Sequence, residues 1–193
     1  MSLSDGQVDV GVVHGRFQIF HHDHLRYVLA AKQRCRHLIV GVTSPDPRQA
    51  PAESTAPHRG DPAANPLTYY ERQAMITACL REAGVACDDL SVVPFPIEQP
   101  ERLSNYAPRD ATYYLTVNDA WGDEKTSRLR SLGVVVHVLW RSEKKTISGT
   151  RIRALMASGG PWRHLVPPAT AAFADRYHIA DRIAGQALNR QVS

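Results

Sequence analysis

Residues 8–24 read Val-Asp-Val-Gly-Val-Val-His-Gly-Arg-Phe-Gln-Ile-Phe-His-His-Asp-His, and this stretch decides the fold. The run from Val8 to Val13 is short, apolar and rich in β-branched residues, which is typical of a strand buried in a parallel sheet. Apolar residues then recur at helical spacing, so we expect a helix that begins near His22 or Asp23. A strand, a tight turn and a helix in this order are the opening unit of an α/β fold.

The same alternation of strand and helix continues to the end of the chain. It predicts further strands over 38–42, 90–95, 111–117 and 134–140, and further helices over 68–83, 123–132, 150–157 and 169–177. We therefore expect an α/β fold, a Rossmann-like doubly wound parallel sheet of about five strands with C-terminal helices. Residues 44–66 hold six prolines and indicate a long functional or mobile loop. With no evident linker, we predict a single domain spanning residues 1–193.

Composition narrows the class of protein. The 193 residues are 43% hydrophobic and 22% charged, with a formal net charge of +4. That excess suits a site for small anions, and no basic stripe with interleaved aromatic residues points to nucleic acid. The three cysteines (Cys35, Cys79 and Cys87) have no Cys-x-x-Cys spacing, so neither a disulfide framework nor a zinc site follows. Without an apolar leader or a long apolar run we expect a cytoplasmic protein that does not bind membranes.

The first candidate site follows the first strand. Gly15 allows a tight turn and a close approach to a ligand, and Arg16 offers a planar fork of donors to phosphate oxygens. His21 and His24 are three residues apart at the start of a helix, so both project from the same side of it. The unpaired N–H groups of that helix end favour anions. Together these groups can bind a triphosphate and stabilise charge on departing pyrophosphate.

The second candidate site is Ile147-Ser-Gly-Thr-Arg-Ile-Arg153, between the last strand and a helix. Ser148 is expected to cap that helix and Thr150 to lie in its first turn, where hydroxyl and N–H groups meet phosphate. Arg151 and Arg153 point in different directions on a helix, so one can face phosphates while the other faces solvent. An ordinary capped helix with basic surface residues would carry the same pattern.

The histidines of the first candidate site also allow other interpretations. A His pair at this spacing is often a capping or surface pair. The run His21-His22-Asp23-His24 carries standard metal-ligand types, but its spacing differs from that of known His-rich metal motifs and no partner cluster follows. We therefore predict no metal ligands among the side chains of this chain.

These motifs make the chain resemble the nucleotidyltransferase superfamily, which is marked by a His-x-Gly-His and a later Ile-Ser-x-Thr-x-x-Arg signature. Within it, the chain looks most like the archaeal-type nicotinamide mononucleotide adenylyltransferases. Their first motif, Gly-Arg-Phe-Gln-Pro-Phe-His-x-Gly-His, is similar to residues 15–24, and their Ser-Gly-Thr-x-Ile-Arg to residues 148–153. Residues 65–72 (Asn-Pro-Leu-Thr-Tyr-Tyr-Glu-Arg) and 160–167 resemble two further family segments.

The resemblance implies a reaction and a set of roles. A substrate phosphate would attack the α-phosphate of ATP and release pyrophosphate, with Mg²⁺ bound mainly through the ATP phosphates and no covalent enzyme intermediate. By position, His21 and His24 would hold the triphosphate, Arg16 would span the reacting phosphates, and Gly15 with Phe17 would shape the nucleotide pocket. The β- and γ-phosphates would be bound by Ser148, Thr150 and Arg153. The acceptor would be nicotinamide or nicotinate mononucleotide.

The chain departs from the family pattern at three places. Asp23 replaces the glycine of His-x-Gly-His, and we expect its side chain to point away as a helix-start residue or to contact a ribose hydroxyl or Mg²⁺-bound water. Ile19 replaces a proline. The family's Leu-Trp pair, whose indole stacks on nicotinamide, has no clear counterpart, so Tyr106, Asn118 and Trp121 are the candidate acceptor-binding residues.

Two other functions stay open. The same scaffold can transfer a cytidylyl or adenylyl group to another small phosphate or phosphonate. A nucleotide-binding regulator without catalysis is the other alternative, and Asp23 is its best support. The resemblance also suggests a homo-oligomer.

Overall fold

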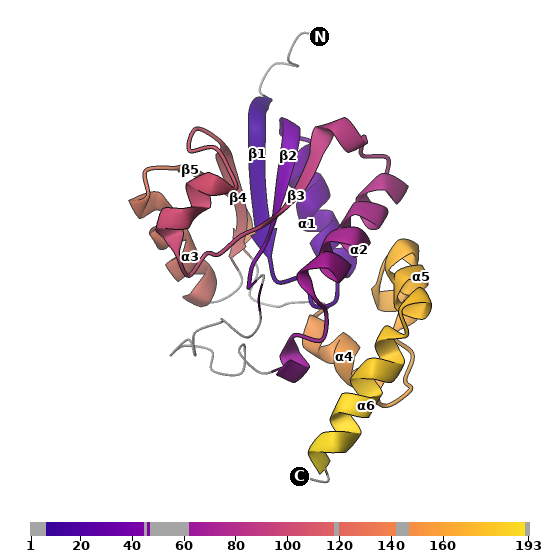
Figure 1. The fold of residues 1–193 in the computed structure, drawn as a ribbon. Helices are drawn as coiled ribbons and strands as arrows, with labels where there is room; N and C mark the ends of the chain where they lie inside the picture. Colours follow the sequence, from indigo (N-terminus) through magenta and orange to yellow (C-terminus); the bar gives the residue numbers. More distant parts are fainter. Residues whose placement is uncertain (1–6, 45, 47–61, 118–119, 142–146, 192–193) are drawn as a thin grey trace. The chain divides into compact units, whose positions relative to one another are not determined.

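The computed structural model describes residues 7–44, 46, 62–117, 120–141 and 147–191 (Figure 1). The strands are β1 (Val8–Gly15), β2 (Cys35–Val42), β3 (Leu90–Pro94), β4 (Thr112–Val117) and β5 (Val135–Arg141). The α-helices are α1 (His22–Lys32), α2 (Tyr69–Glu82), α3 (Ala120–Ser131), α4 (Gly149–Ala157), α5 (Pro168–Arg176) and α6 (Ile179–Gln191). Short 3₁₀ turns are η3 (Pro62–Ala64), η4 (Cys87–Asp89), η5 (Pro100–Asn105) and η6 (Arg163–Leu165).

The five strands form one parallel sheet in the order β3-β2-β1-β4-β5. The chain builds the sheet outward from β1 through β2 to β3, and then returns to add β4 and β5 on the other side of β1. The strand order therefore reverses between β1 and β4. In open α/β sheets ligands bind beyond the carboxyl ends of the strands at such a switch point. The predicted Rossmann-like α/β fold is confirmed.

By compactness the chain divides into two units. The first comprises residues 1–16, 26–45 and 85–145 and holds the sheet with α3; the second comprises residues 17–25, 46–84 and 146–193. Helix α1 begins in the second unit and continues into the first. In the second unit α4 contacts α6, and α2 contacts α5, which in turn contacts α6. The prediction of one domain over residues 1–193 stays a prediction.

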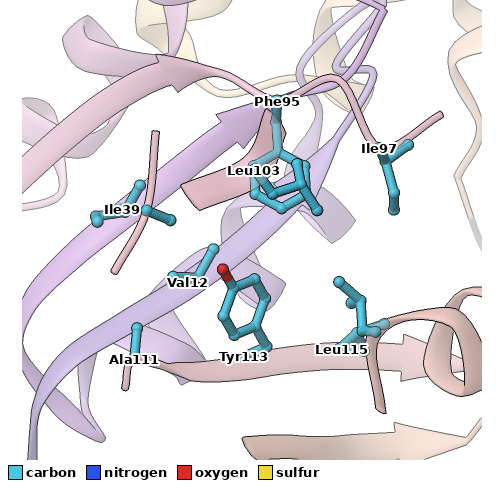
Figure 2. Close-up of a cluster of buried hydrophobic side chains, with 10 residues drawn as sticks. Val12, Ile39, Phe95, Ile97, Leu103, Ala111, Tyr113 and Leu115 are labelled. Carbon is cyan, nitrogen blue, oxygen red and sulfur yellow. The ribbon is translucent and has the colours of Figure 1, made fainter. Parts of the chain in front are cut away.

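One face of the sheet carries the hydrophobic core of the first unit (Figure 2). Val12 of β1 and Tyr113 of β4 are paired across the sheet and point to this face. Leu129 of α3 covers them, as does the segment after β3 that contributes Phe95 and Leu103. The full cluster is Val12, Ile39, Phe95, Ile97, Leu103, Ala107, Ala111, Tyr113, Leu115 and Leu129.

Helix α1 covers the opposite face of the sheet. Its Tyr27 is buried, and the hydroxyl donates a 2.6 Å hydrogen bond to the carbonyl of Tyr114 in β4. The same hydroxyl accepts a hydrogen bond from the backbone N–H of His14 in β1, at 3.4 Å. Burial raises the pKa of this phenol, so the hydroxyl stays neutral. Through these two hydrogen bonds it links β1 and β4 on the side of the sheet that α1 covers.

The predicted elements match the observed ones except at the C-terminal end. The last predicted helix ends at Tyr177, but the chain continues into α6. His178 separates α5 from α6 with a positive φ of 50°, a conformation that sequence patterns rarely signal at a residue other than glycine or asparagine. Most of the proline-rich loop over 44–66 lies outside the described residues. Within the described ranges, no helix is long and apolar enough to cross a bilayer.

Gly41 gives a stability prediction for the first unit. A Cβ at this position would lie 2.6 Å from ring atoms of Phe95, far inside van der Waals contact. Gly41→Ala must therefore displace the Phe95 ring, and we expect it to lower the free energy of unfolding by about 1–3 kcal/mol. Urea denaturation measures the change. In the background of Phe95→Leu the same Gly41→Ala change should cost clearly less; equal costs would show that the two positions are not coupled.

Candidate active site

The two predicted motifs meet within the second unit. Residues 17–24 and 147–153, called the motif pair below, are joined through Gln18. Its carbonyl oxygen accepts a hydrogen bond from Nη1 of Arg153. Gly149 lies directly against the same carbonyl, since a Cβ on Gly149 would be 3.0 Å from the Gln18 carbonyl carbon and 3.1 Å from Nη1 of Arg153. Only a glycine permits this approach, so the Ser-Gly-Thr segment is packed on the first motif by main-chain atoms.

The two histidines of the first motif stack on each other. The ring centroids of His21 and His24 are 3.6 Å apart with an angle of 20° between the planes. The backbone N–H of His24 donates to Nδ1 of His21 at 3.4 Å, so a neutral His21 carries its proton on Nε2. The prediction that both imidazoles project from the same side of the helix start is confirmed. His21 is buried, which keeps its ring in a fixed orientation.

Two phenylalanines support the histidine pair. Phe17 is buried, and its ring meets His24 edge-on at 5.0 Å, while Phe20 is tilted against His24 at 5.7 Å. Phe17 has a positive φ of 52°, which turns the chain sharply just after Arg16. His24 and Arg153 therefore both contact the 17–20 segment, His24 through ring contacts and Arg153 through a hydrogen bond. Imidazole and guanidinium groups from distant parts of the sequence converge on one loop.

The second motif opens α4 as predicted. Ser148 is the N-cap, and its hydroxyl accepts a 3.2 Å hydrogen bond from the backbone N–H of Arg151. Thr150 lies in the first turn, where its hydroxyl accepts from Nη2 of Arg153 at 3.3 Å. The Arg151 side chain is exposed. Of the two arginines, Arg153 is the one turned to the first motif, which agrees with the expected division between them.

Asp23 makes a contact that the sequence analysis did not foresee. Its carboxylate accepts a 2.9 Å hydrogen bond from the backbone N–H of Ile147, at the start of the second motif. Asp23, which replaces the motif glycine, therefore links the two members of the motif pair by this hydrogen bond.

Two substitutions test the hydrogen bond between Asp23 and Ile147. Asp23→Ala removes the acceptor and should lower the free energy of unfolding by about 1–2 kcal/mol, since the partner N–H loses a charge-assisted hydrogen bond. Asp23→Asn keeps an oxygen in place and should retain most of that stability. Thermal or urea unfolding measures both. If Asp23→Asn is as destabilised as Asp23→Ala, the carboxylate charge, rather than the hydrogen bond, holds the segment.

Gln18 also ties the first motif to the 65–72 segment. Its side-chain amide donates to the carbonyl of Leu67 at 2.9 Å and accepts from the Leu67 N–H at 3.0 Å. Thr68 then caps α2 in a capping box with Glu71. Burial alone would raise the pKa of Glu71, but hydrogen bonds from Arg182 and Thr68 outweigh it and hold the pKa below its usual value. The sequence analysis matched this segment to the family without foreseeing that Gln18 anchors it.

The first unit carries the remaining predicted residues. Gly15 ends β1, and its carbonyl accepts from the N–H of Thr43. Arg16 is half-buried, and Tyr106 is half-buried at the end of η5. Trp121 belongs to α3, but its side chain lies outside the described residues, as does all of Asn118. The roles given to Tyr106, Asn118 and Trp121 in acceptor binding stay predictions.

His14 is a residue that the sequence analysis passed over. It precedes Gly15 at the carboxyl end of β1, is only 5% exposed, and stacks on Phe95 with centroids 5.1 Å apart and planes at 18°. Both ring nitrogens are buried without a hydrogen-bond partner among the described residues. Each such atom costs about 1–3 kcal/mol in a folded protein. Burial, with the Lys125 ammonium as a second cause, lowers the pKa of His14 to about 3, so the ring is neutral.

The signal for His14 was present in the sequence. A histidine that directly follows the apolar run of a central strand is expected to be buried, and a buried polar side chain needs a partner or a ligand. Among the described residues, no three His, Cys, Asp or Glu side chains gather closely enough to hold a metal ion. His14 therefore has no metal-ligand cluster around it in that part of the chain.

Comparison with known proteins agrees with this geometry. The family model described as cytidylyltransferase-like matches residues 12–155, from β1 to the end of the motif pair. A phosphonoformate cytidylyltransferase of Streptomyces viridochromogenes is 51% identical over 173 residues, covering 90% of this chain and 94% of that protein. A nicotinamide-nucleotide adenylyltransferase of Thermococcus kodakarensis is 28% identical, covering 95% of this chain and 91% of its own.

Solved structures support the fold. A bifunctional NMN adenylyltransferase/ADP ribose pyrophosphatase of Francisella tularensis superposes with a TM-score of 0.61 at 16% identity, covering 93% of this chain and 52% of that one. The family model spans well over half of the chain, and the motifs it includes lie together as the motif pair. The chain therefore belongs to the cytidylyltransferase-like family of the nucleotidyltransferase superfamily, and it is an enzyme of nucleotidyl transfer.

Proposed function

We propose that this enzyme transfers CMP from CTP to a small phosphonate that also carries a carboxylate, such as phosphonoformate. The observation that carries the proposal is the 51% identity to a phosphonoformate cytidylyltransferase over nearly the full length of both chains. The nicotinamide-nucleotide adenylyltransferases are similar over comparable lengths but at 28% identity. Identity of about one half across a whole domain favours retention of substrate class more than identity of about one quarter. We therefore propose CTP as the nucleotide donor, where the motifs alone had favoured ATP.

The reaction needs no covalent enzyme intermediate. A phosphonate oxygen of the acceptor attacks the α-phosphorus of CTP, and a P–O–P bond forms between acceptor and CMP. The bond from the α-phosphorus to the bridging oxygen breaks, and pyrophosphate leaves with that electron pair. Catalysis then rests on positioning and on stabilising the charge that builds up on the leaving oxygens.

The motif pair supplies groups suited to that charge. The proton on Nε2 of His21 and the imidazole of His24 are donors for triphosphate oxygens, and their stacking fixes their directions. Arg153 and the hydroxyls of Ser148 and Thr150 stand at the start of α4, where the helix N-terminus favours anions. Arg16, directly before this loop in the chain, is assigned to the reacting phosphates, and Gly15 and Phe17 to the nucleotide pocket.

Mg²⁺ fits this scheme as a partner of the nucleotide. No cluster of three acidic or imidazole side chains exists among the described residues to hold a metal by itself. Mg²⁺ is commonly bound through substrate phosphates with few protein ligands, so the triphosphate would carry it and the metal would neutralise the phosphate charge. The homo-oligomer suggested by the motifs also stays a prediction.

Adenylyl transfer from ATP to nicotinamide or nicotinate mononucleotide is the second candidate. It is supported by the 28% identity to several nicotinamide-nucleotide adenylyltransferases and by the shared motifs at residues 15–24, 65–72 and 148–153.

A two-by-two assay separates the two candidates. CTP and ATP are each combined with phosphonoformate and with nicotinamide mononucleotide in the presence of Mg²⁺. Pyrophosphate release and the product mass are the readouts. We expect turnover with CTP and phosphonoformate; turnover restricted to ATP and the mononucleotide overturns the proposal.

Thermal shift adds a test of the nucleotide alone. A nucleotide at a hundred times its dissociation constant stabilises the folded state by about 2.7 kcal/mol, so CTP should raise the melting temperature more than ATP at equal concentration. Tight nucleotide binding without turnover of either acceptor would favour the non-catalytic regulator instead.

A further inference from the structure

Gln18 binds two distant segments of the chain, one through its side chain and the other through its main chain. The side-chain amide donates to the carbonyl of Leu67 at 2.9 Å and accepts from the N–H of Leu67 at 3.0 Å. The main-chain carbonyl of Gln18 accepts a hydrogen bond from Nη1 of Arg153. All three residues belong to the second unit. A single buried residue therefore joins the segment before α2 to the arginine assigned to the triphosphate.

The segment that binds the Gln18 side chain is itself fixed by hydrogen bonds. Residues 66–68, called the anchor segment below, have every main-chain N–H and carbonyl group paired. The carbonyl of Pro66, for example, accepts from Nη2 of Arg182 in α6 at 2.9 Å. A segment whose main chain is fully paired has little freedom to shift, so it is a firm support. Its partners are Arg182 for Pro66, Gln18 for Leu67, and Glu71 and Arg72 for Thr68.

The flanking residues fix the other end of Gln18. Phe17 and Ile19, on either side of it, are each only 1% exposed. Their side chains are therefore held by packing, while the Gln18 amide is held by two hydrogen bonds to Leu67. With the side chain and both neighbours in place, the direction of the Gln18 carbonyl is set.

The Gln18 carbonyl in turn sets the orientation of Arg153. Nη1 of Arg153 donates to this carbonyl, and Nη2 donates to the hydroxyl of Thr150 at 3.3 Å. A guanidinium group is planar, so two of its nitrogens bound to two acceptors fix the direction of the whole group. The acceptor at Nη1 is main chain, and its position depends on Gln18.

We propose that Gln18 is a positioning residue for nucleotidyl transfer, which holds the guanidinium of Arg153 in place with the anchor segment as its support. This rests on the proposed role of Arg153 at the β- and γ-phosphates. Negative charge builds up on those phosphates as pyrophosphate leaves, so a displaced guanidinium costs more in the transition state than in the ground state. Gln18 acts through Arg153 and undergoes no covalent change.

Gln18→Met in the intact enzyme tests this role, because methionine is of similar length but cannot form either hydrogen bond to Leu67. We expect kcat to fall about 10- to 100-fold, since a displacement of roughly 1 Å at a site can cost about 100-fold. The KM for CTP should change less than about threefold, because the loss is mainly one of transition-state stabilisation. Glu82→Met is the control: it removes a side-chain hydrogen bond from the N–H of Ala169 in the same unit, and kcat should stay unchanged.

A double-mutant cycle separates positioning from a merely structural role. In the background of Arg153→Met, Gln18→Met should change kcat less than about threefold, because no guanidinium is left to displace. All four enzymes are assayed at a temperature at which circular dichroism shows each to be folded. An equal loss in both backgrounds, or an unchanged kcat in Gln18→Met alone, overturns the proposal. If Gln18→Met does not fold, Gln18→Asn, whose amide is one methylene shorter, takes its place in the cycle.

A measurement without substrate observes Arg153 directly. The NMR signal of its Nε–H group, assigned by its loss in Arg153→Met, should shift or broaden in Gln18→Met and stay in place in Glu82→Met. An unmoved signal in Gln18→Met overturns the proposal, since the guanidinium would then be held without Gln18.

The choice of substrates keeps this proposal distinct from the proposed function. Turnover of CTP and phosphonoformate with equal losses in both backgrounds of the cycle overturns only the role of Gln18. If the enzyme instead uses ATP and nicotinamide mononucleotide, the proposed function fails, and the same cycle with that pair decides the role of Gln18. Absence of turnover with every pair overturns both.

Discussion

Replacing His24 by alanine should lower kcat by about 100-fold or more, because a donor aimed at charge that develops in the transition state contributes on that scale. The ring of His24 is fixed by stacking on His21 and by edge contact with Phe17, so it acts as a preorganised donor. Steady-state kinetics with CTP and phosphonoformate measure the effect. A rise in KM alone, with kcat unchanged, would show that His24 binds substrate and transition state equally well.

The matched control is His22→Ala. His22 lies on the same turn of α1, carries the same ring and is exposed, whereas His24 is partly buried against aromatic rings. Removing it changes the helix start in the same way but leaves the stacked pair intact. We expect kcat within about twofold of the unchanged enzyme, because substitutions on exposed positions away from such features have small effects.

Gly149→Ala should lower kcat/KM by about 100-fold, the scale expected when a group at the site is displaced by roughly 1 Å. The new Cβ would press on the carbonyl of Gln18, which is main chain and cannot swing away. The two members of the motif pair must then separate, and Arg153 loses its position beside Gln18. Assays of kcat/KM for CTP, with circular dichroism to confirm folding, measure the result.

Gly185→Ala is the control for this change. Gly185 lies in α6 of the same unit, and a Cβ there would meet nothing within 4 Å. Alanine in a helix interior is favoured over glycine by about 1 kcal/mol, so this variant should be slightly more stable and fully active. Equal activity of the Gly149→Ala and Gly185→Ala enzymes would show that the close approach at Gln18 is dispensable.

Much of the fold could be predicted from the order of residue types along the chain. The β-branched run before Gly15 predicted a buried parallel strand, because side chains in such a strand face helices on both sides. Ser148 predicted the start of α4, because its hydroxyl satisfies an N–H that the helix cannot. Helix α6 was missed, because the break before it depends on the positive φ of His178, and no residue-type rule announces that break.

The candidate site could be predicted from the sequence only in part. Spacing placed His21 and His24 on one side of a helix, because three residues complete nearly one turn. Spacing could not show that Asp23 bonds the N–H of Ile147, 124 positions away, or that Gln18 clasps Leu67. Those contacts depend on where distant segments come to rest, and a local pattern carries no information about that.

The sequence by itself determined the α/β class, the two phosphate-handling motifs and their place at the ends of strands and helices. These follow from hydrophobic period, helix capping and the reach of neighbouring side chains, all of which act within a few residues. Only the tertiary structure decided that the two motifs touch through Gln18 and Gly149 and that Asp23 links them by a hydrogen bond. It also decided that His14 is buried with no hydrogen-bond partner for either ring nitrogen among the residues that the structure describes. Burial and long-range contact arise when separate segments pack together, and that packing is a property of the whole fold.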